Sequence, residues 1–229
     1  MPTRPPLSRE RVLRAAIAFV EEHGLEALSM RKLAQELGVE AMSLYNHVAN
    51  KNDILHGMVE LVAAEIEPAA EGAEWKSALR ASAVSVHETL TRHPWAARMW
   101  TSRSGPSEIG MRYADAVLRA FREAGFTKEL TYHAYHTLEG YVYGFTLQEL
   151  NFAFDPAKVK EMAASFLRDF PKDEYPYLAE HVAQHVEPRR RRGRAFELGL
   201  DLILDGLERM RDARASKPAR GRSGRSSSR

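Results

Sequence analysis

The stretch that most constrains the fold of this 229-residue chain is LSMRKLAQELGVEAMSLYNHVANK, residues 28–51. Its apolar residues are spaced as in two short helices joined by a turn around Gly38. Ala34 is small where these helices must cross closely, and Gly38 suits a left-handed turn residue. The residues that we expect to pack inward are Leu28, Leu33, Ala34, Leu37, Val39, Leu44 and Val48.

The second helix of this pair carries small, polar or aromatic residues on its outward face, and no acidic residue. The outward set is Ala41, Met42, Ser43, Tyr45, Asn46 and His47. Such a face can lie against phosphates and base edges without charge repulsion, as the recognition helix of a helix-turn-helix must. A three-helix cap with a solvated face is the alternative that the pattern alone leaves open.

Cap and stop signals divide the rest of the chain into helices, without a convincing strand. Ser8 caps a helix that ends at His23, and Ser29 caps a helix that ends at Leu37. A third helix spans about 41–47, and a fourth begins at Asn50 or Asn52 and runs to Pro68. We therefore expect an all-α fold in which residues 1–50 form a three-helix, helix-turn-helix DNA-binding domain.

A small, acidic link over residues 67–74 is the best place for a domain boundary. Further helices are expected near 75–92, 94–101, 107–124, 127–152, 156–169, 174–186 and 193–213. We assign residues 51–213 to a second, helical domain for effector binding and dimerisation, with 51–67 as a connecting helix. Residues 214–229 are rich in Arg, Ser, Gly and Pro, which predicts a disordered basic tail.

Composition excludes several function classes. The chain has no cysteine, so it has neither disulfides nor thiolate metal sites, and this fits a reducing cytoplasm. Neither a signal peptide nor a membrane-spanning apolar run is present, and we expect a cytoplasmic protein without a membrane partner. Its net charge is only +2, so DNA affinity must come from local patches.

Catalytic motifs are absent as well, and we expect no enzyme activity. His133, His136 and Glu139, and also His181 with His185, have a spacing that a metal could use. Core or surface histidines explain such spacings more often, so we expect no metal and no cofactor. An enzyme that uses these histidines is one rival hypothesis, and an architectural DNA-binding protein without a ligand is another.

The stretches RKLAQELGVE and SLYNHVANK, with the helix before them, resemble the TetR family of transcriptional regulators, and closely the branch of the tetracycline repressor. The resemblance implies that Ser29, Met30 and Arg31 approach the DNA backbone and that Tyr45 and Lys51 contact phosphates. It also implies that Ala41, Met42, Ser43, Asn46 and His47 face the major groove.

Two of these positions depart from the tetracycline repressor. Ala41 stands where that protein has a base-reading amide, and Asn46 where it has a large aromatic residue. The implied docking geometry is the same, but the operator sequence should differ. By resemblance, the chain is a repressor that binds a palindromic operator in double-stranded DNA as a homodimer and is released by a small-molecule inducer.

The resemblance extends into the second domain, where it implies a helical module that dimerises and binds the inducer. The helix over 127–152 is apolar on two sides, and the last helix repeats Phe196, Leu200, Ile203, Leu204, Leu207 and Met210. Pairing these two helices with their symmetry mates predicts a four-helix dimer interface.

Aromatic and polar residues between 94 and 143 suggest an inducer pocket, although single members of the set could instead belong to the core. The predicted ligand-binding residues are Trp95, Trp100, Arg103, Phe121, Tyr132, His136, Glu139 and Tyr143. Trp100 stands where the tetracycline repressor has its metal-binding histidine, and Ser82 replaces an amide that contacts the drug. We therefore expect a largely apolar inducer and disfavour a magnesium–tetracycline complex.

Overall fold

A computed structural model of the chain describes residues 6–100, 107–151, 156–168, 170–184 and 192–216. These residues contain helices and no strand, which confirms the predicted all-α fold. The helices are α1 (Arg9–His23), α2 (Met30–Leu37), α3 (Ala41–Leu44), α4 (Lys51–Ala63), α5 (Trp75–Arg92), α6 (Pro94–Trp100), α7 (Glu108–Glu123), α8 (Lys128–Asn151), α9 (Pro156–Arg168), α10 (Pro176–Gln184) and α11 (Arg192–Ala215). A short 3-10 turn, Leu25–Ala27, follows α1.

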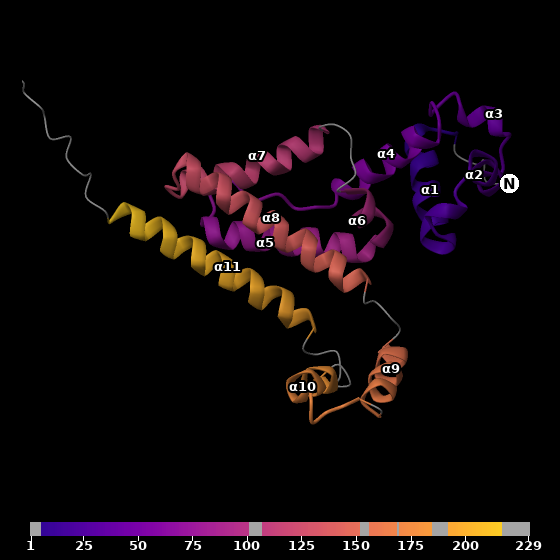
Figure 1. Cartoon of the computed structure of the whole chain (residues 1–229). Helices are drawn as coiled ribbons and strands as arrows, with labels where there is room; N and C mark the ends of the chain where they lie inside the picture. Colours follow the sequence, from indigo (N-terminus) through magenta and orange to yellow (C-terminus); the bar gives the residue numbers. More distant parts are fainter. Residues whose placement is uncertain (1–5, 101–106, 152–155, 169, 185–191, 217–229) are drawn as a thin grey trace, which may run out of the picture.

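The small N-terminal group of helices lies at one end of the molecule (Figure 1). The predicted caps are present: the Ser8 hydroxyl accepts from the Arg11 amide and that of Ser29 from the Lys32 amide. Gly38 ends α2 in the left-handed conformation, with φ 63°. Of the residues expected to pack inward, all are buried except Val39, which is half-buried.

Helix α4 is joined to α1 by two contacts. The Arg9 guanidinium donates to both carboxylate oxygens of Asp53, at 2.6 and 2.8 Å, and the Ala49 amide donates to Asp53 at 2.9 Å. Further along, Gly57 lets the two helices cross closely, because a Cβ atom there would lie 2.6 Å from a methyl group of Leu13. The start of α4 therefore belongs structurally to the N-terminal domain.

The C-terminal body packs α5, α6, α7, α8 and α11 around one core, with α11 alongside α5 and α8 (Figure 1). At one end, the rings of Trp75, Phe121 and Phe126 meet with centroids 5.0–6.0 Å apart. At the other, His87 stacks on Phe196 at 4.0 Å between the rings. Two ion pairs, Arg80 with Asp201 and with Glu197, also join α5 to α11.

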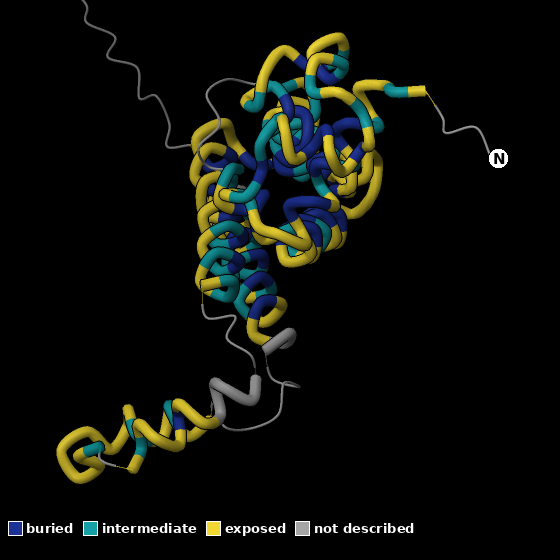
Figure 2. The backbone as a smooth tube through the Cα atoms, turned by 90° about the vertical axis from the view of Figure 1, so that its right-hand side faces the viewer, coloured by how far each residue is buried: buried dark blue, intermediate teal, exposed yellow. Residues whose placement is uncertain are grey.

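Helices α9 and α10 pack on each other and stand away from the body in both views (Figures 1 and 2). Most of their described residues are exposed, including Phe166 and Tyr177. None of the helices in the described part of the chain is long and apolar enough to cross a membrane.

The structure differs from the sequence-based prediction in three places. Helix α3 ends at Leu44, not near His47, because the following amides donate three residues back, from Tyr45 to Met42 and from His47 to Leu44. Helix α4 ends at Ala63 in a turn, before Pro68, and α11 continues to Ala215. The rest of the predicted tail, 217–229, lies outside the described residues.

Candidate DNA interface and ligand site

The predicted DNA-contacting segment is a single turn of α-helix followed by a tighter turn. Leu44 and Val48 are buried beneath it and fix its position on α1 and α2. On the opposite side, Met42 is 75% exposed and Tyr45 47% exposed, and Asn46 is exposed as well. Large apolar and aromatic side chains that face solvent together are unusual in a monomeric surface and indicate a contact surface.

The remaining predicted DNA contacts surround this segment. Arg31 is exposed on the first turn of α2, while Ser29, Met30, Ala41, Ser43, His47 and Lys51 are half-buried. The Ser29 hydroxyl accepts from the Lys32 amide and its carbonyl accepts from the Leu33 amide, so the other backbone amides at the start of α2 are the donors that suit a phosphate. Lys51 is the first residue of α4. The structure thus groups these residues at one end of the molecule, and their contacts with DNA stay a prediction.

The predicted ligand-binding residues do not form one group. Trp95 and Phe121 are buried in the hydrophobic core, and Phe121 packs on Trp75 and Phe126. Tyr132 is 62% exposed and His136 is exposed, so this half of the predicted α8 stripe faces outward and not into a pocket. Arg103 lies outside the described residues.

The other three, Trp100, Glu139 and Tyr143, do lie together inside the body. The Tyr113 hydroxyl from α7 donates to the Glu139 carboxylate at 3.1 Å, and Tyr143 forms a second hydrogen bond with it. The Trp100 and Tyr143 ring centroids are 6.2 Å apart. Ser82, on α5, lies beside the Tyr113 hydroxyl. We call Ser82, Trp100, Tyr113, Glu139 and Tyr143 the inner cluster.

The electrostatics of the inner cluster are those of a partly desolvated site. Burial raises the pKa of Glu139, although hydrogen bonds from Tyr113 and Tyr143 oppose that shift. Burial, together with the Glu139 charge, also raises the pKa of both tyrosines, so their hydroxyls stay protonated as donors. All three side chains nevertheless keep some accessible surface. A group that is desolvated yet accessible is suited to meeting a ligand.

The sequence did not point to Tyr113 as a site residue, and Ser82 was named only as the residue that replaces a drug-contacting amide of the tetracycline repressor. Ser82 is 2% exposed, and its hydroxyl completes no hydrogen bond with a described residue. The signal for Tyr113 was its position four residues before the buried Val117 on the same face of α7. Buried hydroxyls usually have partners, and the group that Ser82 lies beside is the Tyr113 hydroxyl.

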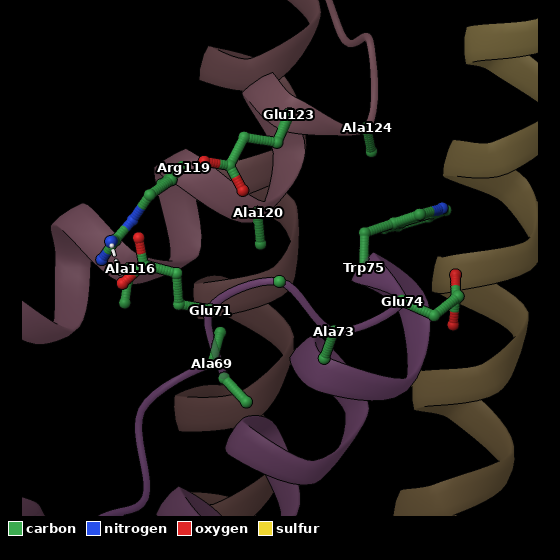
Figure 3. Close-up of a pocket in the computed structure, with 12 residues that line it drawn as sticks. Ala69, Glu71, Ala73, Glu74, Trp75, Ala116, Arg119, Ala120, Glu123 and Ala124 are labelled. Carbon is green, nitrogen blue, oxygen red and sulfur yellow. Dashed lines mark ion pairs between the residues drawn. The ribbon is translucent and has the colours of Figure 1, made fainter.

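A separate surface pocket of about 280 Å³ lies between the 69–74 link, the start of α5 and the end of α7 (Figure 3). Half of its lining residues are alanines, including Ala73, Ala116 and Ala120, and none of the predicted ligand-binding residues lines it. Three of its charged groups are already engaged, since Glu71 pairs with Arg119 at 3.0 Å and Glu74 caps α5. This pocket and the inner cluster are thus separate places in the body.

No group of three or more possible metal ligands occurs among the described residues. The acidic residue Glu149 lies 3.5 Å from His87. His87 also contacts Thr146 at 2.9 Å. These contacts of His87 join α5 to α8. His185, which with His181 had a spacing suited to a metal, lies outside the described residues.

The predicted dimerisation residues of α11 need a correction. Phe196, Leu200, Leu204 and Leu207 are buried in the protomer's own core, because α11 lies with that side against α5 and α8. Leu198 and Leu202, on the other side of the helix, are each 62% exposed. These leucines are available to a second protomer, as is Met210 of the predicted set, which is 50% exposed, while Ile203 is half-buried. The four buried residues are not available.

A capped helix-turn-helix with an exposed recognition segment, joined by α4 to a helical body with a desolvated polar cluster, defines a two-domain DNA-binding regulator. Comparison with known proteins identifies the family. Residues 12–58 match the model of the bacterial regulatory proteins of the tetR family. Residues 67–211 match that of the tetracyclin repressor-like C-terminal domain. The chain belongs to the TetR family.

Similar proteins include the transcriptional repressor DrrR1 of Streptomyces coeruleorubidus, 33% identical over 90% of this chain and 78% of that protein. The class A tetracycline repressor from transposon 1721 of Escherichia coli is 31% identical over 87% and 90%. Among solved structures, Streptomyces coelicolor ActR in complex with actinorhodin superposes with a TM-score of 0.73 at 28% identity, covering 93% and 100%. The chain is thus a ligand-responsive, DNA-binding transcriptional regulator, of a family that acts as dimers.

Proposed function

We propose that this protein is a repressor that binds a palindromic operator as a homodimer and leaves it when an inducer occupies the inner cluster. The observation that carries the proposal is the exposed segment Met42, Tyr45 and Asn46, held rigidly over a buried anchor and joined by α4 to the body that contains the cluster. The repressor function in DrrR1 and the tetracycline repressor supports the direction of regulation.

The mechanism follows from the position of α4. Its first turns are held by α1, and its last turns contact α6, whose final residue, Trp100, belongs to the inner cluster. A ligand that moves α6 therefore moves α4 and the recognition segment. In a dimer the two segments must span half-sites about one helical turn, roughly 34–36 Å, apart, so a small change of spacing prevents both from binding together.

We propose that the inducer is an organic molecule that binds without a metal ion. Trp100 occupies the position of the tetracycline repressor's metal-binding histidine, and an indole cannot coordinate magnesium. Neither catalysis nor a cofactor is part of the proposed function, and we place the protein in the cytoplasm with its DNA. The actinorhodin complex of ActR shows that a related body holds a polycyclic organic molecule.

Selection of bound sequences from a random double-stranded DNA pool tests the proposal. A palindromic consensus is expected, and Tyr45→Ala or Lys51→Ala should weaken binding to all sequences; Lys51→Ala, which removes a cation, should also lower the salt dependence. Asn46→Ala or His47→Ala should change the preferred bases instead. The matched control is Tyr177→Ala, an 85% exposed tyrosine on α10, which should change nothing. Wild-type operator affinity in both Tyr45→Ala and Lys51→Ala would refute the docking geometry.

A further inference from the structure

The Glu139 carboxylate has no charged partner in the described part of the protein. Among the described residues, burial and the hydroxyls of Tyr113 and Tyr143 influence its pKa, and no basic side chain contributes. His136, one turn earlier on α8, is exposed at the surface. An acid in such surroundings is stabilised when a positive charge comes close to it, since a desolvated charge without a counter-ion is costly.

The groups around this acid are aromatic. Tyr113 and Tyr143 hold the carboxylate, and Trp100 packs near Tyr143. Burial raises the pKa of Tyr135, and the nearby Glu139 charge adds to that shift. Ring faces carry partial negative charge and attract cations, most strongly in the case of tryptophan and tyrosine. The same faces and the carboxylate repel an anionic ligand.

The two hydrogen-bond donors do not saturate the site. A carboxylate offers about four lone-pair positions, and Tyr113 and Tyr143 account for two of them. The Ser82 hydroxyl is buried beside Tyr113, and it completes no hydrogen bond of good geometry with a described residue. The site therefore combines open acceptor positions on an acid with a weakly engaged hydroxyl and aromatic rings.

We propose that the inducer presents a positively charged nitrogen to Glu139, with its carbon framework between Trp100, Tyr113 and Tyr143. This inference rests on the proposed function, because it names the chemical class of ligand that the regulator recognises. A neutral ligand could use the same hydrogen bonds, but it would gain neither the ion pair nor the contact of a cation with the rings.

The test uses two dyes with one ring system: rhodamine 6G, an aromatic cation, and the O-methyl ether of fluorescein ethyl ester, which is uncharged. Each is titrated into the full-length, DNA-free protein by calorimetry, and benzyltrimethylammonium competes with rhodamine 6G as a small cation. We expect rhodamine 6G to bind at least about 10-fold more tightly than the uncharged dye, and the small cation to displace it.

Two variants locate the binding. Glu139→Gln keeps the shape and removes the charge, so rhodamine 6G affinity should fall by about 10-fold or more, with unchanged circular dichroism. Glu149→Gln, on the same helix but beside His87, should leave it unchanged. Equal affinity for the two dyes, an unaffected Glu139→Gln variant, or no binding of either cation overturns the proposal. Should Glu139→Gln fail to fold, the wild-type comparison of the dyes decides.

Operator binding is measured in parallel on the selected DNA, so that the two proposals fail separately. If the protein binds its operator but neither cation, only the proposed ligand class is contradicted. A protein that shows no sequence-specific DNA binding contradicts the proposed function, whatever it does with the dyes.

Discussion

His93 of the body contacts Glu21 of the DNA-binding domain, with 2.7 Å between the imidazole Nδ1 and the carboxylate. The other ring nitrogen lies 3.3 Å from Glu65, at the end of α4, which also accepts from Arg92 at 3.0 Å. His93 directly precedes α6, the helix that ends at Trp100. One imidazole thus joins the DNA-binding domain, the connecting helix and the helix that reaches the ligand site.

Glu21→Gln should loosen the contact between the two domains without unfolding either. The carboxylate of Glu21 is the only group of α1 that meets His93 among the described residues, and its loss leaves the domains joined mainly through α4. We expect faster hydrogen exchange at the end of α1 and a change in operator affinity of a few-fold. Glu10→Gln, which breaks a pair with Arg14 inside the same helix, is the control. Equal exchange in both variants would contradict the role of His93.

Leu198→Glu with Leu202→Glu should separate the dimer and leave the protomer folded. Both leucines are exposed on the protomer, so the new charges meet water in the monomer and become unfavourable only when a partner covers them. Leu204→Glu buries a charge in the protomer's own core and should cost several kcal/mol of stability. Sedimentation velocity with circular dichroism distinguishes the two outcomes. A folded dimer in the double variant would place the interface elsewhere.

Asp53→Asn should destabilise the protein at neutral pH, by about 1 kcal/mol because the pair is partly exposed. Hydrogen bonds from Arg9 and Ala49 lower the pKa of Asp53 from 3.8 to about 2. The folded-state pKa is depressed, so the stabilisation is fully present above pH 3.8 and is lost as the pH falls through about 2. Thermal unfolding of wild type and variant across pH 2–7 measures this difference. If wild type and variant still differ in stability by the same amount at pH 2, the ionised Arg9–Asp53 pair is not the cause of the difference.

Gly57→Ala should destabilise the protein by about 1–3 kcal/mol, although alanine is the better helix former. The added methyl group would lie 2.6 Å from a Leu13 methyl in a buried crossing. Gly206→Ala on α11 is the control, because its nearest neighbour would be Arg209 at 3.9 Å. Urea unfolding that finds both variants equally stable would show that α1 and α4 can separate at no cost.

Local chemistry made much of the N-terminal domain predictable. Ser8, Ser29 and Gly38 each determine a helix end through a hydrogen bond or a backbone conformation of their own, so their neighbours need not be known. Between Asn50 and Asn52, the pattern could not choose. The structure selects Asn50, whose side chain accepts from the Asp53 amide.

The ligand site was only partly predictable, for a geometric reason. Tyr132, His136, Glu139 and Tyr143 share one face of α8, as their spacing indicates. Periodicity assigns residues to a face, but it does not show how far along that face the neighbouring helices reach. Glu139 and Tyr143 are covered by α6 and α7, whereas Tyr132 and His136 are not. Tyr113 comes from another helix, so only the tertiary arrangement brings it to the cluster.

Polar contacts hold α4 near both of its ends: Arg9 binds Asp53, and His93 contacts Glu65. A helix held in this way has little freedom to bend, so we expect it to move as a rigid body. Its thirteen residues span about 20 Å at 1.5 Å per residue, so a tilt of about 10° at the ligand end would carry the DNA end through about 3.5 Å. That distance is about the rise of one base pair, enough to move a recognition segment one step out of register with its half-site.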